Sequence, residues 1–234
     1  MPFKLKNRKL AFLALIFFII FCLLGFWQLS RAKFKKTLLK SYAARTLSTP
    51  LSASQLAAEK DYRFYRANLI GQFDNQHVFL LDNKTFHGKI GYEVYIPFRA
   101  EGFAQPILVD MGFIPMGTFR NQLPTIKPIV GKKSITGMLN FPPAYVSLGK
   151  IQESKKIVWP LRIEFIQLPE LSNLLNDKLF SYILMIDPKH LDAYSIEWQV
   201  TIMSPEKHLA YAVQWFALAL TLLILFVVLN WDKK

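Results

Sequence analysis

Two long uncharged stretches dominate the hydrophobic pattern of this 234-residue chain. The first runs from Leu10 to Leu29 and the second from Leu209 to Leu229. A helix of about 20 apolar residues spans the roughly 30 Å hydrocarbon core of a bilayer. Tryptophan favours the membrane–water interface, and Trp27, Trp215 and Trp231 lie near the ends of the two stretches. The pattern predicts two transmembrane helices rather than two buried helices of a soluble core.

The first stretch has the features of an uncleaved anchor. A cleaved signal peptide has an apolar region of about 7–15 residues followed by a small-residue cleavage site. Here the apolar run is longer, and it continues into Gln28-Leu29-Ser30-Arg31-Ala32-Lys33-Phe34. No Ser- and Arg-rich transit segment precedes it. We therefore expect a bacterial protein rather than an unprocessed mitochondrial precursor.

The residues between the two stretches have the pattern of a β-rich domain. Runs of alternating or β-branched residues between turn signals predict seven strands: Arg63–Gly71, His77–Asp82, Tyr92–Phe98, Pro106–Met111, Lys133–Leu139, Tyr182–Ile186 and Ser195–Met203. Its size, about 150 residues, is normal for one domain. The expected fold class is an integral membrane protein in which two transmembrane α-helices flank a β-rich α+β extracytoplasmic domain. That domain is either a barrel or a sandwich, because the pattern fits both.

Three helical segments complete the expected fold. Residues 32–47 extend the first transmembrane helix, because apolar side chains recur every four residues at Phe34, Leu38 and Tyr42. A short helix is predicted over Ser52–Lys60. Another is predicted over Arg162–Leu175, with an interruption before Pro169.

The charge distribution points to a membrane surface. The net charge is +13, but residues 1–45 contain ten Lys or Arg and no acidic residue. The rest of the chain has 19 basic and 16 acidic residues, so the excess flanks the first span, where it meets anionic lipid headgroups. No basic patch interleaved with aromatic residues indicates nucleic-acid binding.

Two spans place both tails on one side of the membrane and the domain on the other. The predicted segments are a tail 1–9, a transmembrane helix 10–29, the domain 30–207, a transmembrane helix 208–230 and a tail 231–234. The Lys and Arg residues near the span ends do not decide which side is cytoplasmic. The single cysteine, Cys22, lies inside the first span and excludes an intramolecular disulfide.

The sequence contains no GxSxG, HExxH, P-loop or GxGxxG motif, so no catalyst is predicted. His77, His87 and His190 lie near predicted strand ends or turns and are expected to be surface or capping residues. Three carboxylates, Asp74, Asp82 and Asp110, are expected to form turns or to be solvated rather than to act as an acid–base pair.

The most informative polar residues lie at the membrane edge. His208, Tyr211 and Trp215 share one helical face, since they are three and four residues apart. Trp27 and Arg31 likewise share a face where the first span ends. The alternative interpretation is a belt of interfacial aromatic residues with a snorkelling arginine. An ionisable residue at membrane depth nevertheless indicates a functional site.

The two-span topology places both groups at the same membrane surface, where they could hold a planar anionic cofactor. A histidine offers an axial nitrogen, as in many haem proteins. Trp and Tyr offer apolar walls with polar tips. Arg31 offers a planar fork suited to a carboxylate.

A series of short motifs extends through most of the chain. They are Leu24-Gly25 with Trp27-Gln28 and Arg31, Gly71 with Phe73-Asp74, Gly91-Tyr92 before Pro97, Leu108-Val109-Asp110 before Gly112 and Ile114-Pro115, Leu123-Pro124, Gly137 with Pro142, Trp159-Pro160, and His208 with Tyr211-Ala212 and Gln214-Trp215-Phe216. In order and spacing the chain resembles the Surfeit locus protein 1 family of haem-copper oxidase assembly factors. One departure is Met111-Gly112-Phe113, where the family typically has Arg-Gly-Trp.

The resemblance implies a bacterial inner-membrane protein with a periplasmic domain and cytoplasmic tails. It implies binding of haem a and its delivery to the catalytic subunit of cytochrome c oxidase, with His208 as the ligand of the haem iron. Tyr211, Trp215, Trp27 and Arg31 complete the expected cofactor-binding set, with Arg31 as a propionate partner. Expected partners are the catalytic subunit, the enzymes of haem a synthesis and membrane lipids, and not nucleic acid. The alternatives are a scaffold for an oxidase subunit that binds no haem, and a membrane-tethered enzyme, for which no acid, base or nucleophile set stands out.

Overall fold

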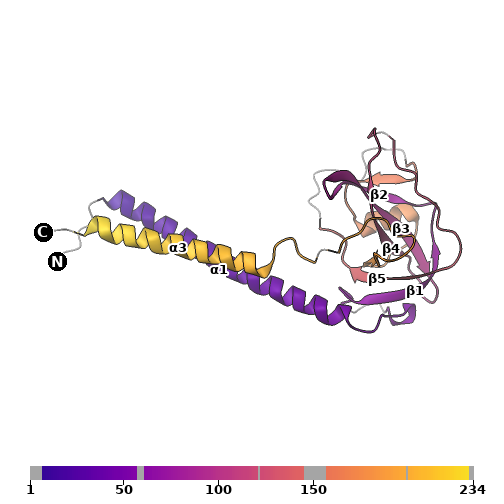
Figure 1. Cartoon of the computed structure of the whole chain (residues 1–234), viewed down its shortest axis with the longest axis horizontal. Coiled ribbons are helices and arrows are strands. Elements are labelled where there is room, and N and C mark those ends of the chain that lie inside the picture. Colours follow the sequence, from indigo (N-terminus) through magenta and orange to yellow (C-terminus); the bar gives the residue numbers. More distant parts are fainter. Residues whose placement is uncertain (1–6, 57–60, 121, 145–156, 199, 232–234) are drawn as a thin grey trace. The chain divides into compact units, whose positions relative to one another are not determined.

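A computed structural model of the chain describes residues 7–56, 61–120, 122–144, 157–198 and 200–231 (Figure 1). It consists of two compact units. One contains residues 1–41 and 199–234 and is helical. The other contains residues 42–198 and is built around a β-sheet.

The helical unit contains the two predicted spans. Helix α1 covers Arg8–Thr46 and helix α3 covers Pro205–Asn230. Both are long and apolar enough to cross a membrane. In the most apolar window, 6% of the residues of α1 and 11% of those of α3 are buried within the protein, unlike the core helices of a soluble protein. The predicted extension of the first helix to residue 47 is confirmed, since α1 continues without a break to Thr46.

The sheet contains seven strands: β1 (Arg66–Phe73), β2 (Phe79–Phe86), β3 (Lys89–Ala100), β4 (Ile107–Pro115), β5 (Lys133–Asn140), β6 (Leu161–Ile163) and β7 (Ile183–Ile186). Their order is β1-β5-β7-β4-β3-β2-β6, and β1 also pairs with β3. This additional pairing closes β1, β5, β7, β4 and β3 into a five-stranded barrel. Of the two predicted architectures, the barrel is therefore the one that forms.

A glycine is required where the barrel closes. Gly71 on β1 lies opposite Ala100 on β3. A Cβ atom at Gly71 would lie 2.0 Å from the carbonyl oxygen of Arg99. Only a residue without a side chain lets the two strands approach so closely.

The strands are buried on both faces, so the domain has two hydrophobic cores. Because successive side chains of a strand point to opposite faces, Ile96 and Leu184 enter the larger core, inside the barrel. Their neighbours Tyr95 and Ile183 enter a second core that also contains Leu171. Leu171 belongs to helix α2, Leu168–Leu175, which covers the outer face of the barrel wall.

Three sequence predictions need correction. The helix predicted over Arg162–Leu175 begins only at Leu168, with Pro169 in its first turn, because Leu161–Ile163 pairs in parallel with β2 as strand β6. The helix predicted over Ser52–Lys60 is one 3₁₀ turn, Ala53–Gln55, and residues 57–60 lie outside the described residues.

The strand predicted over Ser195–Met203 does not form in the described part of that segment. Strand β7 pairs with β4 only at Leu108–Asp110. Beyond Asp110, β7 no longer pairs with this edge of β4. Here the edge forms a single bridge, in which the Phe113 N–H donates to the Ser195 carbonyl oxygen at 2.7 Å. An alternating pattern forms a ladder only where a strand lies alongside, and the described residues after Ser195 are not paired with one.

Candidate functional site

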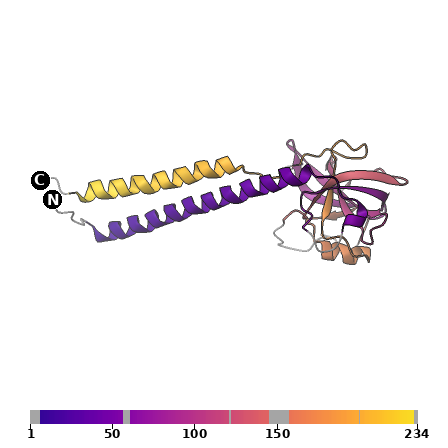
Figure 2. The same ribbon diagram turned by 90° about the horizontal axis from the view of Figure 1, so that it is seen from below.

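Helices α1 and α3 lie side by side and run in opposite directions (Figure 2). Small residues are buried where the helices meet: Gly25 and Ala32 on α1, and Ala212 and Ala219 on α3. A Cβ atom at Gly25 would lie 2.6 Å from the ring of Phe216. Close approach over small residues is the usual way in which membrane helices pack.

Helix α3 begins so that His208 lies in its first turn. The Ser204 side chain caps the helix by accepting from the Lys207 N–H at 3.4 Å, and Pro205 follows at a position that needs no backbone donor. His208 is 7% exposed. A residue predicted from sequence to mark the site is therefore buried in the helix pair.

The two ring nitrogens of His208 have different surroundings. Its Nδ1 lies 2.7 Å from Oε1 of Gln28 on α1. Its Nε2 is buried and has no hydrogen-bond partner among the described residues. Buried polar atoms are normally paired, so the unpaired nitrogen points to a ligand.

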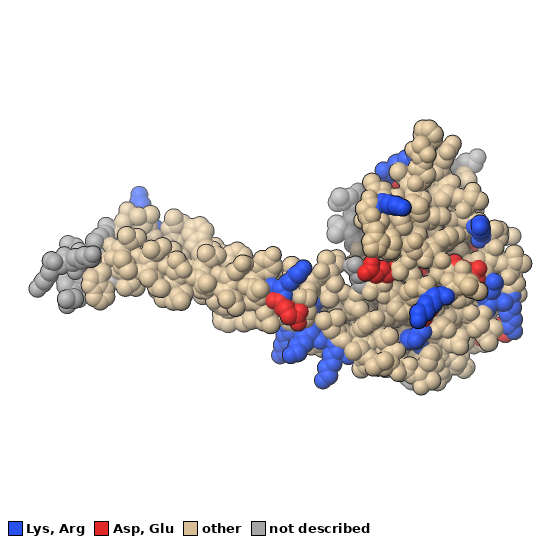
Figure 3. Space-filling model, viewed as in Figure 1, with Lys and Arg blue, Asp and Glu red and all other residues tan. Residues whose placement is uncertain are grey.

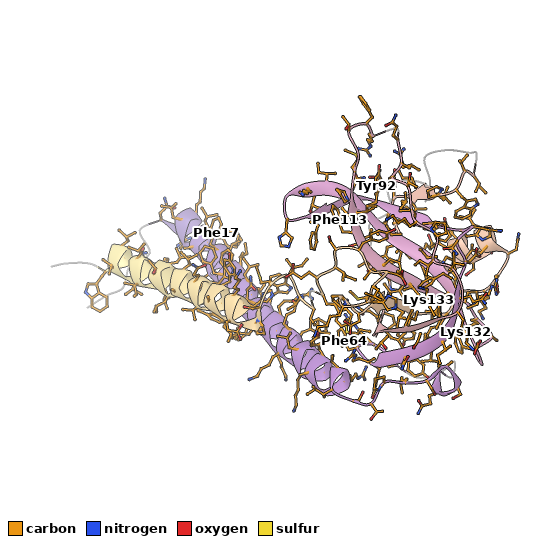
Figure 4. All side chains as sticks on the ribbon, turned by 45° about the vertical axis from the view of Figure 1, so that its right-hand side comes forward. Phe17, Phe64, Tyr92, Phe113, Lys132 and Lys133 are labelled. Carbon is orange, nitrogen blue, oxygen red and sulfur yellow. The ribbon has the colours of Figure 1, made fainter. Side chains whose placement is uncertain are left out.

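An aromatic pair lies about two helical turns from His208. The rings of Trp215 on α3 and Phe21 on α1 stack with their centroids 5.8 Å apart and an interplanar angle of 29°. Trp215 is thus held against α1, about two turns after His208 on the same face of α3. Figure 4 marks Phe17, which lies one turn before Phe21 on α1 and has its ring 6.0 Å from that of Phe21.

Trp27 and Arg31 contact each other, as their spacing predicts. The guanidinium of Arg31 lies 5.4 Å from the centroid of the Trp27 ring, a cation–π distance. Trp27 is 50% exposed and Tyr211 on α3 is 44% exposed. These side chains are available to a molecule at the surface of the helix pair.

Helical geometry places these exposed groups on one side of the contact between Gln28 and His208. At about 100° per residue, Arg31 is turned about 60° from Gln28, and Tyr211 about 60° from His208 in the same rotational sense. Two antiparallel helices in contact are related by an approximate two-fold axis perpendicular to the plane of their axes. Equal turns therefore lead to the same side of the pair. The opposite side is filled by the contact of Phe216 with Gly25.

Of the five predicted site residues, His208 is buried against α1 near the start of α3, where it contacts Gln28. Tyr211, Arg31 and Trp27 line one side of this contact, and Trp215 packs farther along the same face. Gln28 is the residue that sequence reasoning missed. Its signal was present, since it is an amide near the end of an otherwise apolar stretch, directly between two residues already selected.

Basic residues surround this end of the helix pair. Figure 3 shows the uncharged length of the helices bounded by Lys and Arg. On α1 these include Lys33, Lys36 and Lys40, and on α3 Lys207, with Glu206 as the acidic residue of the first turn. The positive charge suits anionic lipid headgroups or the acidic groups of a cofactor.

The barrel contains a second group of buried polar residues, and here one prediction was wrong. Asp110, expected at a turn or in solvent, lies within β4 and is 5% exposed. Its Oδ1 accepts from the Gly112 N–H at 2.9 Å, and its Oδ2 lies 3.4 Å from the Tyr95 hydroxyl. That hydroxyl is also 3.2 Å from Glu93, which forms a 2.9 Å ion pair with Lys84.

Burial and the nearby Glu93 charge raise the pKa of Asp110 to about 7. The same causes, burial first and then the carboxylates of Asp110 and Glu93, raise the pKa of Tyr95. Gly112 follows with a φ of +99°, where β3 and β4 change register. We assign this cluster a structural role within the sheet.

The remaining candidates have ordinary partners. Asp74 forms a turn and lies 2.7 Å from Nδ1 of His77. Asp82 is also buried, contrary to the prediction, and pairs with Arg120 at 3.0 Å. His87 is exposed at a hairpin turn, as expected. No group of three or more His, Cys, Asp or Glu residues that could hold a metal ion occurs within the described ranges.

The family departure at residues 111–113 lies in β4. Met111 is fully buried inside the barrel, and the Phe113 ring stacks on that of Phe86 at 5.5 Å. Figure 4 shows Phe113 beside Tyr92 of the neighbouring strand β3. These residues fill space in the barrel wall.

The fold defines a class of membrane protein in which a five-stranded barrel domain is inserted in sequence between two membrane helices. The sequence matches the SURF1 family over residues 15–220, and the chain belongs to that family. Proteins of this family are known generally as oxidase assembly factors.

Similar proteins include a SURF1-like protein of Rickettsia prowazekii (strain Madrid E), which is 28% identical in a match that covers 94% of this chain and 89% of the relative. A SURF1-like protein of Rickettsia felis is 27% identical over 94% of this chain and 96% of its own length. A SURF1-like protein of Rickettsia bellii is 27% identical over 91% of this chain and 87% of its own.

Proposed function

We propose that this protein binds haem a at the His208 site and assists its insertion into the catalytic subunit of a haem-copper oxidase. The observation that carries the proposal is the buried, unpaired Nε2 of His208. An imidazole nitrogen is a common axial ligand of haem iron. An unpaired buried acceptor is unfavourable by about 1–3 kcal/mol, which coordination to iron would offset.

The side chains around His208 fit a planar, amphipathic, acidic ligand. The exposed faces of Trp27 and Tyr211 offer apolar contact to a macrocycle. Arg31 offers a guanidinium suited to a propionate carboxylate. Trp215, about two turns after His208 on α3, packs against Phe21 of α1 and extends this aromatic face.

The burial of Nε2 has a consequence for the way such a site loads. Iron reaches this nitrogen only after the side chains that cover it move. A site with a single histidine ligand suits a carrier that must release its haem. It suits an oxygen- or electron-handling haem protein less well, because there the cofactor stays bound.

We place the protein in the bacterial inner membrane, with both tails cytoplasmic and the barrel in the periplasm. The catalytic subunit of the oxidase is the proposed acceptor, the enzymes of haem a synthesis are proposed donors, and the basic residues of α1 contact lipid headgroups. The proposed role is that of an assembly factor and not of a catalyst.

The test is the absorption spectrum of the full-length protein purified from a host that makes haem a. We expect a Soret band in the wild type that is lost in His208→Ala. His87→Ala, which removes an exposed histidine of the barrel, is the matched control and keeps the band. An unchanged band in His208→Ala would remove this residue from the site.

The scaffold alternative predicts a different result. A protein that holds an oxidase subunit without binding haem would copurify with that subunit from cells that lack haem a synthesis. It would also show no Soret band from cells that make haem a.

A further inference from the structure

The hydrogen bond between Gln28 and His208 joins residues 180 positions apart in sequence and links the two membrane helices. We propose that Gln28 is the positioning residue of the site: it fixes the proton of His208 on Nδ1 and thereby presents Nε2 to the haem iron. This inference rests on the proposed function.

The chemistry of the amide sets the direction of the bond. The partner of Nδ1 is Oε1 of Gln28, at 2.7 Å. A carbonyl oxygen of an amide only accepts hydrogen bonds, so Nδ1 must carry the proton. In a neutral imidazole the other nitrogen, Nε2, then has a free lone pair. This is the form that binds a metal.

A hydrogen bond that served only to hold the helices together would not need this arrangement. Such bonds in membrane proteins contribute on the order of 1 kcal/mol. His208, however, leaves Nε2 buried and unpaired among the described residues, which is unfavourable by about 1–3 kcal/mol. The contact as a whole gains little stability from the histidine, and so the arrangement points to a ligand of Nε2.

An acceptor on the non-coordinating nitrogen also affects the metal. Histidine ligands of metals almost always donate their other N–H to a nearby acceptor, which orients the ring and raises the basicity of the coordinating nitrogen. Loss of such a partner typically weakens metal binding about 10- to 100-fold. Increased basicity favours ferric over ferrous iron and so lowers the reduction potential of the haem.

The donor and the acceptor come from different helices. The orientation of Nε2 therefore exists only while α1 and α3 are paired at this position. The close packing of Gly25 against Phe216, less than one turn from Gln28 on α1, holds the helices at the distance that the hydrogen bond requires.

The first readout needs no haem. Full-length protein with ¹⁵N-labelled histidine, in lipid nanodiscs, reports by NMR which nitrogen of each neutral ring carries the proton, and His208→Ala assigns the His208 signals. We expect wild-type His208 to be protonated on Nδ1. Gln28→Leu should redistribute the proton between the two nitrogens, and Gln28→Glu, which keeps an acceptor, should restore the Nδ1 form.

The second readout uses the haem-loaded protein. Gln28→Leu should weaken haem binding about 10- to 100-fold and raise the midpoint potential, whereas Gln28→Glu should lower the potential below that of the wild type. Asn230→Leu is the control, since it removes another largely buried polar side chain of the helix pair, 22 residues from His208, and should change neither readout.

The possible results separate this inference from the proposed function. If the wild type binds haem through His208, but Gln28→Leu changes neither the tautomer nor the potential, the inference is overturned and the proposed function stands. If the wild type binds no haem, the proposed function is overturned, and the role of Gln28 toward iron with it, whatever the tautomer.

Discussion

Asp110→Asn should make the stability of the barrel nearly independent of pH between about 4 and 7. In the wild type, burial and the Glu93 charge raise the pKa of Asp110 from 3.8 to about 7. A carboxyl group with a raised pKa in the folded state stabilises the fold while it is protonated. That contribution is present below the unfolded pKa and is lost as the pH rises through about 7.

The magnitude follows from the size of the shift. About three pKa units correspond to at most about 4 kcal/mol of free energy at roughly 1.36 kcal/mol per unit. For a protein of this size, this lowers the thermal midpoint by on the order of 10 °C between pH 4 and pH 8. Asparagine keeps an oxygen for the Gly112 N–H and offers an N–H to the Tyr95 hydroxyl, but carries no charge.

The assay is the thermal midpoint of the full-length protein in detergent across this pH range. Above pH 7, Asp110→Asn should be more stable than the wild type, and near pH 4 the two should be similar. Asp82→Asn is the matched control: it also removes a buried carboxylate, but one paired with Arg120 and Arg162, so it should be destabilising at pH 7. If the thermal midpoint of the wild type does not decrease as the pH is raised from 4 to 8, the reasoning is refuted.

Substitutions at three further sites test the packing. Gly71→Val places a Cβ 2.0 Å from a backbone carbonyl of β3 and should destabilise the barrel by more than about 3 kcal/mol. If the variant has the same thermal midpoint as the wild type, the closure between β1 and β3 is contradicted. Gly25→Leu should push Phe216 and α3 away and shift the imidazole ¹⁵N signals of the α3 histidine, with a smaller shift for Gly25→Ala; unchanged signals in both would show that the helices do not touch there. Leu184→Ala empties part of the barrel core and should lower stability by about 2–5 kcal/mol, whereas Ile90→Ala, at a position 58% exposed, should change it by less than about 1 kcal/mol.

Much of the fold could be predicted because its signals are local. An uncharged run of about 20 residues is itself the property that inserts a helix into a bilayer, so both spans could be located from sequence alone. Six of the seven predicted strands match β1 to β5 and β7, with ends that differ by a few residues. Strand β6 was missed because three residues are too few to show an alternating pattern.

The same local signal misled where a partner decides the structure. Ser195–Met203 alternates like a strand, but only Ser195 finds a free edge, beside Phe113. Asp110 lies within the predicted strand Pro106–Met111, but only the folded sheet buries its side chain, which was expected at a turn or in solvent. Neither outcome can be derived from the residues of the segment, because each depends on which distant strand lies alongside.

The sequence by itself determined two membrane helices, a β-rich domain between them, and a histidine with aromatic neighbours at the membrane edge. Only the tertiary structure decided that the sheet closes through β1 and β3. It also decided that His208 faces Gln28 while its Nε2 stays unpaired. The physical reason is the same in both cases: hydrophobicity and periodicity belong to a single segment, whereas a barrel closure or a hydrogen bond between helices is a relation between segments brought together only by folding.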